Sequence, residues 1–236
     1  MKKTFLITRP QNDSAKIVQF LESQGFSTVI EETFSVENLP FTAQNSIDKN
    51  TQALIITSSN ACHTVINSGI SLDIKIFAVG KQSAYILNEA GYKNIFYPQI
   101  SSAQNLQKLI AENAQPQNGK LLYFCGNYIT LDFKQSLEHL GFSVDKIPAY
   151  KIHWHENFST EFLQKISETS IDFILFYSQN SIKNFHRMAK HNNLLEYFSH
   201  SKLFCFSEKI ALVAKNLGFK NCAQFNEFPL LKNFYK

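Results

Sequence analysis

The chain has 236 residues, enough for one large or two small domains, and its 44% hydrophobic and 18% charged residues are typical of a folded globular protein. Its formal net charge of +4 mildly favours acidic ligands, but its lysines and arginines form no run that would indicate a nucleic-acid partner. No apolar stretch approaches the roughly 18 residues of a membrane span, and the run Phe5–Ile7 is too short for a signal peptide. We therefore expect a cytoplasmic protein that binds neither nucleic acid nor membranes.

Short apolar runs separated by polar turns predict β-strands that alternate with helices. In chain order the runs are 5–7, 53–56, 76–79, 121–125, 173–176 and 203–206. Continuous apolar runs of this length are typical of parallel strands that are covered by helices on both faces. The helical segments between them end at a glycine before an aromatic residue, where a left-handed backbone stops a helix. These glycines are Gly25, Gly91, Gly141 and Gly218.

Parts of this pattern occur twice. Residues 75–94 match 202–221 without a gap, and residues 53–60 match 173–180. Joined by right-handed crossovers, the duplicated βαβ material predicts an α/β fold with two doubly wound parallel sheets.

The domain boundaries are expected where helical periodicity is missing. We predict a discontinuous first domain of residues 1–34 plus 155–236 and a second domain of residues 38–149. The linkers are expected at about 35–37 and 150–154.

The cysteines and histidines show no spacing that is typical of metal ligands, so we predict reduced structural thiols, surface histidines and no metal site. The cysteines are Cys62, Cys125, Cys205 and Cys222, and the histidines are His63, His139, His153, His155, His186, His191 and His200.

Six landmarks follow one another along the chain. They are Leu6–Pro10, Ile55–Ala61, Phe77–Ala84, Ser101–Ala103, Leu121–Asn127 and Ile147–Tyr150. Each is weak alone, but in this order and spacing the chain resembles the uroporphyrinogen-III synthase family over nearly its whole length. The resemblance implies two flavodoxin-like domains, doubly wound around parallel sheets and joined by a two-segment linker, with the first domain discontinuous.

The resemblance also implies a reaction. A member of this family acts as a cyclising carbon–oxygen hydro-lyase: hydroxymethylbilane, a linear tetrapyrrole with eight carboxylates, loses its terminal hydroxyl and closes to uroporphyrinogen III with the last pyrrole ring inverted. No metal or organic cofactor is expected. We expect a monomer whose partners are this small-molecule substrate and, transiently, the preceding enzyme of the pathway.

An octacarboxylate favours a site built from helix N-termini, because their N–H groups and dipole stabilise anions by about 0.3–1 kcal/mol each. Parallel sheets place such helix starts along the carboxyl edge. Arg9 is expected to be a charged clamp on a carboxylate. The residues expected to line the substrate-binding cleft are Arg9, Ser58, Ser59, Asn60, Lys81, Gln82, Ser83, Ser101, Ser102, Ser178, Gln179 and Asn180. The alternative is that the serines and asparagines only cap their helices.

Tyr150 matches a tyrosine of the family that is proposed to assist departure of the substrate hydroxyl. A phenol suits this role, because it can donate a hydrogen bond to a leaving oxygen at neutral pH. The alternative is a linker tyrosine that packs between the domains.

The chain departs from the family pattern at one segment and at one single residue. The segment is Ser207–Ile210, which stands where the family usually has a turn with glycine and threonine; its Glu208 would repel carboxylates. Tyr177 stands where threonine is more common before Ser178. The Ser207–Ile210 departure leaves an inactive synthase homologue open. A second rival is a non-catalytic small-molecule binding protein, since two α/β lobes around a cleft describe such proteins too. A phosphate or nucleotide enzyme is disfavoured, since GxxxxGK[ST] and GxGxxG are absent.

Overall fold

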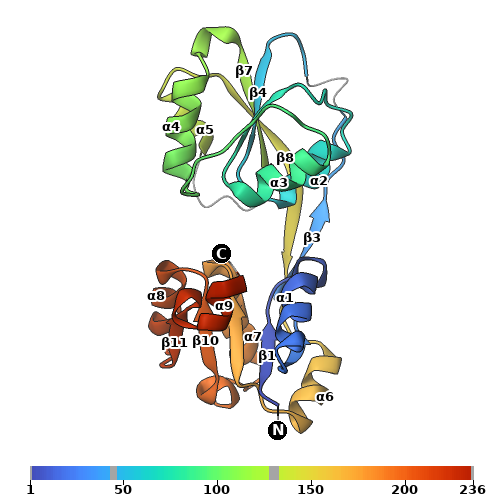
Figure 1. Cartoon of the computed structure of the whole chain (residues 1–236), viewed down its shortest axis with the longest axis vertical. Helices are drawn as coiled ribbons and strands as arrows, with labels where there is room; N and C mark the ends of the chain where they lie inside the picture. The colour runs from blue at the N-terminus through green and yellow to red at the C-terminus, as the bar shows by residue number, and fades with distance from the viewer. Residues whose placement is uncertain (1, 43–46, 128–132, 235–236) are drawn as a thin grey trace. The chain divides into compact units, whose positions relative to one another are not determined.

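The chain forms two compact units (Figure 1). The first comprises residues 1–35 and 153–236, and the second comprises residues 36–152. Each has its own sheet and its own apolar core. The computed structural model describes residues 2–42, 47–127 and 133–234.

The described part of the first unit contains a five-stranded parallel sheet with strand order β11-β10-β9-β1-β2. Its strands are β1 (Thr4–Ile7), β2 (Ser27–Ile30), β9 (Phe173–Phe176), β10 (Lys202–Cys205) and β11 (Cys222–Gln224). Its helices are α1 (Gln11–Ser23), α6 (Thr160–Glu168), α7 (Gln179–His191), α8 (Glu208–Asn216) and α9 (Pro229–Phe234). Neighbouring strand residues face opposite sides, so Leu6 and Phe5 lie in different core clusters. Helices cover both clusters, which explains why the strands are apolar throughout.

The second unit has a six-stranded sheet within its described residues, in the order β3-β8-β7-β4-β5-β6. Its strands are β3 (Phe34–Asn38), β4 (Thr51–Ile56), β5 (Lys75–Ala78), β6 (Ile95–Phe96), β7 (Lys120–Gly126) and β8 (Val144–Trp154). Its helices are α2 (Asn60–Ile66), α3 (Lys81–Glu89), α4 (Ala103–Asn113) and α5 (Phe133–Glu138). The pairs from β8 through β7, β4 and β5 to β6 are parallel. Ile55 and Ile56 lie in opposite core clusters, so this sheet is also covered on both faces. The predicted α/β class with parallel sheets is confirmed.

The segments expected to be linkers, 35–37 and 150–154, lie within β3 and β8, which are hydrogen-bonded neighbours. Pairing continues beyond β3, because the Leu39 N–H donates to the Ala149 carbonyl at 2.9 Å. These segments are therefore hydrogen-bonded strands, a conformation that the alternating apolar and polar residues of 34–38 and 150–154 favour.

The four predicted helix-ending glycines all have a left-handed backbone, with φ values of 86°, 97°, 87° and 95° in chain order. At Gly91 the N–H donates to the Asn88 carbonyl at 2.9 Å, and the next N–H, of Tyr92, donates to Leu87 at 3.1 Å. These two bonds satisfy carbonyls at the end of α3, and the φ they require favours glycine. The prediction is confirmed.

None of the described helices is both long and apolar enough to cross a membrane.

Aromatic rings fill much of the core in the first unit. Phe185 is fully buried, and its ring centroid lies 4.9 Å from Phe198, 5.3 Å from Phe176 and 5.5 Å from Phe158. These separations are in the range where aromatic pairs attract one another.

We predict that Phe185→Ala lowers the free energy of unfolding by about 3–5 kcal/mol, because it removes this ring and leaves a cavity. Urea denaturation would measure the loss. Leu140→Ala, which truncates a side chain that is 46% exposed, is the control and should change stability by less than about 0.5 kcal/mol. Equal losses in the two variants would contradict the packing described.

Candidate active site

Tyr150 lies in β8, on the core of the second unit, and not in an irregular linker. The register of β7 and β8 shifts between Cys125, which pairs with Pro148, and Gly126, which pairs with Tyr150. Such a bulge re-aims the side chain that follows it. The Asn127 N–H donates to the Tyr150 carbonyl at 3.1 Å, and the Ile152 N–H donates to the Asn127 side-chain oxygen at 2.9 Å. The backbone around the tyrosine is therefore fixed on both sides.

Gly126 makes room for the Tyr150 ring. A Cβ at position 126 would lie 2.5 Å from ring atom Cε2 and 3.0 Å from the hydroxyl oxygen. No real side chain tolerates the shorter distance, so the ring occupies space that only a glycine leaves open. Gly126 belongs to the landmark Leu121–Asn127, but the sequence pattern does not indicate this role for it.

The Tyr150 side chain is only 6% exposed and shares a hydrogen bond with Ser58. Burial raises the pKa of the Tyr150 phenol above its ordinary value near 10, and the Ser58 hydrogen bond opposes that shift. An ordinary phenol is already protonated at neutral pH and the raised pKa leaves it so, which lets Tyr150 donate a hydrogen bond. Ser58 follows the carboxyl end of β4, so the structure joins one predicted binding residue to the predicted catalytic residue.

The start of α3 is the helix N-terminus that best fits the anion-binding prediction. Its N-cap is Gly80, which supplies no side-chain cap, and Lys81 and Gln82 are exposed in the first turn. The Ser101 hydroxyl lies against Gly80, because a Cβ at position 80 would overlap it. Loop residue Ser101 is thereby brought to the α3 start.

Other predicted residues have structural duties. The Ser102 hydroxyl caps α4 by accepting from Asn105 N–H at 3.1 Å, and the Ser178 hydroxyl caps α7 by accepting from Ser181 N–H at 3.0 Å. The capping alternative therefore holds for both. Ser83 is only 3% exposed, since the third residue of α3 faces the core, and it does not present its hydroxyl on the surface.

The remaining predicted residues lie at the starts of α2 and α7. Ser59 and Asn60 are partly exposed; Ser59 makes no side-chain cap, and the Asn60 N–H donates to the Ser58 hydroxyl at 3.3 Å. In the first unit, Gln179 is exposed and Asn180 is partly exposed. Their chemistry stays a prediction.

Arg9 lies at the carboxyl end of β1, but its guanidinium is held in a way that the sequence did not indicate. Its central carbon lies 4.6 Å from the centroid of the Tyr177 ring, and Nη2 donates to the Asp13 carbonyl. Nε is buried and has no hydrogen-bond partner among the described residues. The ring contact could not be foreseen, because Arg9 and Tyr177 lie far apart in sequence.

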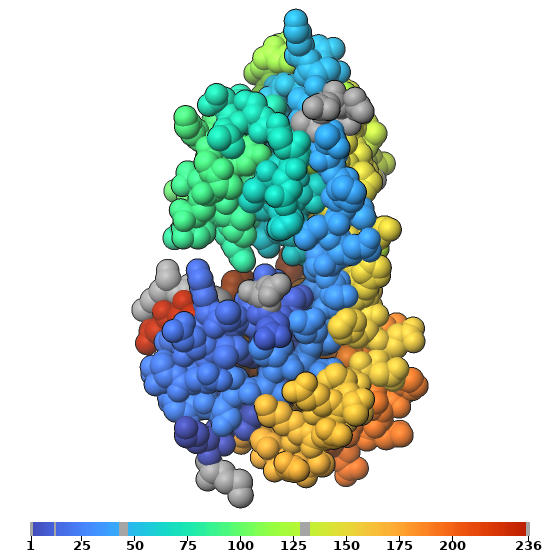
Figure 2. Space-filling view, turned by 90° about the vertical axis from the view of Figure 1, so that its right-hand side faces the viewer, coloured from blue at the N-terminus to red at the C-terminus, as the bar shows by residue number. Residues whose placement is uncertain are grey.

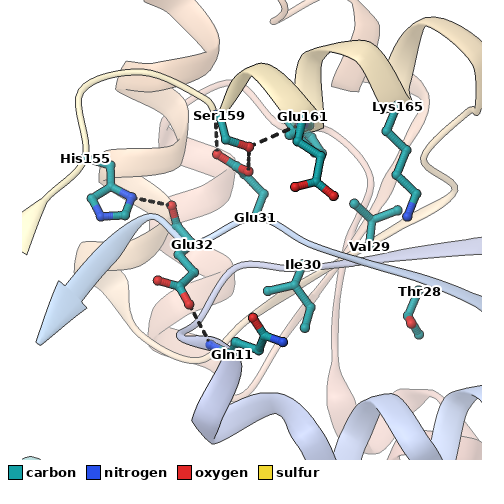
Figure 3. A pocket seen from close by; sticks show the side chains of 11 residues that line it. Gln11, Thr28, Val29, Ile30, Glu31, Glu32, His155, Ser159, Glu161 and Lys165 are labelled. Atoms are coloured by element: carbon teal, nitrogen blue, oxygen red, sulfur yellow. Dashed lines mark hydrogen bonds between the residues drawn. The ribbon is translucent and has the colours of Figure 1, made fainter.

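A separate cavity of about 490 Å³ lies in the first unit (Figure 3). Figure 2 shows α6, coloured yellow to gold, beside the blue N-terminal segment, and both line this cavity. Ser159 donates to Glu31 twice, from its N–H at 2.8 Å and from its hydroxyl at 2.6 Å, and Glu32 accepts from the Gln11 N–H at 2.7 Å. Glu161 adds a third carboxylate to the lining. An anionic substrate is disfavoured there.

Within the residues that the structure describes, no three His, Cys, Asp or Glu side chains gather in a way that could hold a metal ion. Cys62, Cys125 and Cys205 are buried and Cys222 is partly buried, all of them as free thiols. Burial raises the pKa of Cys62 to about 11 and that of Cys205 to about 12, so both stay protonated and unreactive at neutral pH.

The fold and the site together define a class of protein. It has two α/β units with parallel sheets, and in the second unit helix N-termini and a buried tyrosine lie at the carboxyl edge of the sheet. A family model described as uroporphyrinogen-III synthase HemD matches residues 3–228. The chain belongs to the uroporphyrinogen-III synthase family, whose members act in tetrapyrrole synthesis.

Individual relatives are distant. A uroporphyrinogen-III synthase from Chlorobaculum parvum is 26% identical over 203 residues, 78% of each chain. An uncharacterised protein from Rickettsia prowazekii is 26% identical over 208 residues, 72% of this chain and 74% of its own. The crystal structure of uroporphyrinogen-III synthetase from Helicobacter pylori has a TM-score of 0.66 at 15% identity and covers 100% of this chain and 98% of its own. It shows the same fold.

We predict that Gly126→Ala lowers the free energy of unfolding by about 1–3 kcal/mol, because the added methyl group displaces the Tyr150 ring. In a Tyr150→Ala background the same change should cost less, since the ring is gone. A double-mutant cycle by urea denaturation measures this coupling. Additive losses would show that the glycine and the ring do not compete for space.

We also predict a pH effect from Glu31. Burial raises the pKa of this carboxyl above 4.5, so between 4.5 and the raised value the folded protein binds more protons than the unfolded chain. The contribution of Glu31 to stability is thus greatest at low pH and falls as the pH rises through that window. Glu31→Gln keeps partners for Ser159 but cannot ionise. Denaturation at a series of pH values from 4 to 8 should show a flatter pH dependence in the variant; identical slopes would contradict the assignment.

Proposed function

We propose that the chain converts hydroxymethylbilane to uroporphyrinogen III, with loss of water and inversion of the last pyrrole ring. The observation that supports this most directly is the buried, protonated Tyr150 phenol, hydrogen-bonded to Ser58 at the carboxyl end of β4. The α3 start and Ser101 belong to the same sheet edge, because β4 and β5 are parallel neighbours.

In this proposal Tyr150 assists the leaving group. Its hydroxyl donates to the terminal hydroxyl of the substrate, which departs as water and leaves an electrophilic methylene on the first ring. The substituted carbon of the last ring then attacks, and the resulting spiro intermediate rearranges to the inverted ring, with release of a proton. Acid assistance of this kind contributes roughly 10²–10⁴-fold.

The larger contribution is positioning. Unaided closure of the linear tetrapyrrole gives the symmetric type I isomer, so the protein must hold the last ring with its substituted carbon towards the methylene. Oriented binding can contribute about 7–11 kcal/mol to a reaction. The exposed Lys81 and the α3 start, which has no side-chain cap, are the groups that we propose bind substrate carboxylates. The reaction involves no net oxidation or reduction, so we propose that it needs no redox cofactor, and we propose no other cofactor for it. We also propose that the protein acts as a monomer.

The decisive experiment feeds freshly generated hydroxymethylbilane to the purified protein, oxidises the products and separates type I from type III uroporphyrin by chromatography. A type III excess that scales with protein concentration is expected. Only type I, formed at the rate of the buffer control, would instead indicate a binding protein or an inactive homologue.

For Tyr150→Phe we predict a fall in kcat of about 10²-fold, because the variant keeps the ring but loses the donor. The loss of stability should stay near 1 kcal/mol, the usual value of one hydrogen bond.

Tyr92→Phe is the matched control. Tyr92 is 2% exposed and donates to the Val65 carbonyl at 3.0 Å, so this variant also removes a buried, hydrogen-bonded hydroxyl from the second unit. Its turnover should equal that of the wild type. Wild-type turnover in Tyr150→Phe would exclude the acid role.

A further inference from the structure

Four side chains gather at the carboxyl edge of the first unit's sheet. Arg9 follows β1, Tyr177 follows β9, Phe206 follows β10 and Phe225 follows β11. These strands are neighbours in the order β11-β10-β9-β1, so the four residues come together although they lie far apart in sequence. We call them the aromatic edge cluster.

The rings of the cluster hold one another. Tyr177 and Phe206 are stacked, with centroids 6.3 Å apart and planes 28° apart, and Phe225 meets both edge-on at 5.3 and 5.5 Å. The Arg9 guanidinium lies 4.6 Å from the Tyr177 centroid. Phe225 is 4% exposed, whereas Phe206 is 53% exposed. The cluster therefore presents one large ring to solvent on a support that limits its rotation.

Helix starts in this unit are poorly suited to bind carboxylates. The α8 helix begins with Glu208, whose charge repels anions. The first N–H of α1, from Gln11, already donates to the Glu32 carboxylate, and α7 is capped by Ser178. Besides these helix starts, the described residues of this edge present a ring face and a guanidinium.

Arg9 brings a positive charge to the cluster. Its Nε is buried and has no hydrogen-bond partner in the described part of the chain, so a ligand would meet the outer edge of the guanidinium and not this atom. A planar guanidinium can contact an aromatic ring with its face and a carboxylate with its edge at the same time.

We propose that the aromatic edge cluster binds one pyrrole ring of the substrate, with Phe206 contacting the ring face and Arg9 contacting a carboxylate of the same ring. This inference rests on the proposed function, because it takes the substrate to be the linear tetrapyrrole. An aromatic ring that carries acidic groups matches the ring of Phe206 in shape and the charge of Arg9, and we expect any further carboxylate on that ring to point away from Glu208. Tyr177, which departs from the family pattern, then supports a ring contact with the substrate at this edge.

The test compares Phe206→Ala, Phe206→Leu and Phe206→Trp. Loss of the ring should raise KM for hydroxymethylbilane about tenfold in the alanine variant, the equivalent of one aromatic contact. The leucine variant should recover little of this and the tryptophan variant most of it, because the contact depends on a flat ring. With binding lost equally in ground and transition states, kcat should stay unchanged.

Leu212→Ala is the matched control, because Leu212 is 58% exposed on α8 and makes no part of the cluster. A parallel titration with uroporphyrin III, followed by its fluorescence, measures binding without turnover. The affinity should fall in Phe206→Ala and not in Leu212→Ala.

These experiments distinguish failure of the proposed function from failure of the proposed role of the aromatic edge cluster. If the wild-type protein yields no type III excess, the proposed function is wrong. If it yields type III, but Phe206→Ala keeps the wild-type KM and the wild-type affinity for uroporphyrin III, the function stands and the role of the cluster is wrong. An equal KM increase in Leu212→Ala would also overturn that role, since the effect would not be specific to the ring.

Discussion

Parallel pairing is the constraint on which both candidate surfaces depend. A parallel sheet must return each strand in the same direction, so its carboxyl ends share one edge, and the residue that follows each strand is delivered there. In the second unit this rule brings Ser58 and Gly80 to one edge and places Gly126 with Tyr150. In the first unit it gathers Arg9, Tyr177, Phe206 and Phe225. A slip of one residue in any register would turn the apolar side chains of that strand to the other face, so the cores that fix the sheets also fix these edges.

Each unit contains one copy of the duplicated module. In the two copies, the turn between strand and helix carries side chains of opposite charge. In the ungapped match, Val79 corresponds to Phe206, Gly80 to Ser207 and Lys81 to Glu208. One turn offers a cation beside a glycine N-cap, whereas the other offers an exposed ring beside a carboxylate. Duplication explains why both turns lie at a carboxyl edge. The substituted residues reverse the charge at the first helical position, so the two helix starts differ in their attraction for an anion.

Sequence patterns predicted the features that depend on neighbouring residues. The apolar runs and the glycine stops follow from local backbone preferences and from burial on both faces, and the structure has them where expected. The roles of the serines at helix starts were harder to predict from sequence. A serine that caps a helix and a serine that binds an anion occupy the same position, so sequence could not separate Ser102, which caps, from Ser101, which lies against Gly80. The depth of Ser83 depends on how α3 is rotated against the sheet, which a short helix does not reveal.

Contacts across long sequence separations could not be predicted. Arg9 stacks on Tyr177, and the Tyr150 ring packs against Gly126. Both contacts depend on which strands are neighbours in the sheet, and local sequence does not reveal that order. Gly126 shows how the residue at one position can determine where a distant side chain packs. The missing side chain leaves room for the tyrosine ring beside β7, and the bulge in β8 re-aims this side chain, whose hydroxyl interacts with Ser58. Burial raises the pKa of a phenol that is already protonated at neutral pH, so this packing does not supply the proton; it fixes the position of a hydrogen-bond donor at the edge of the second unit.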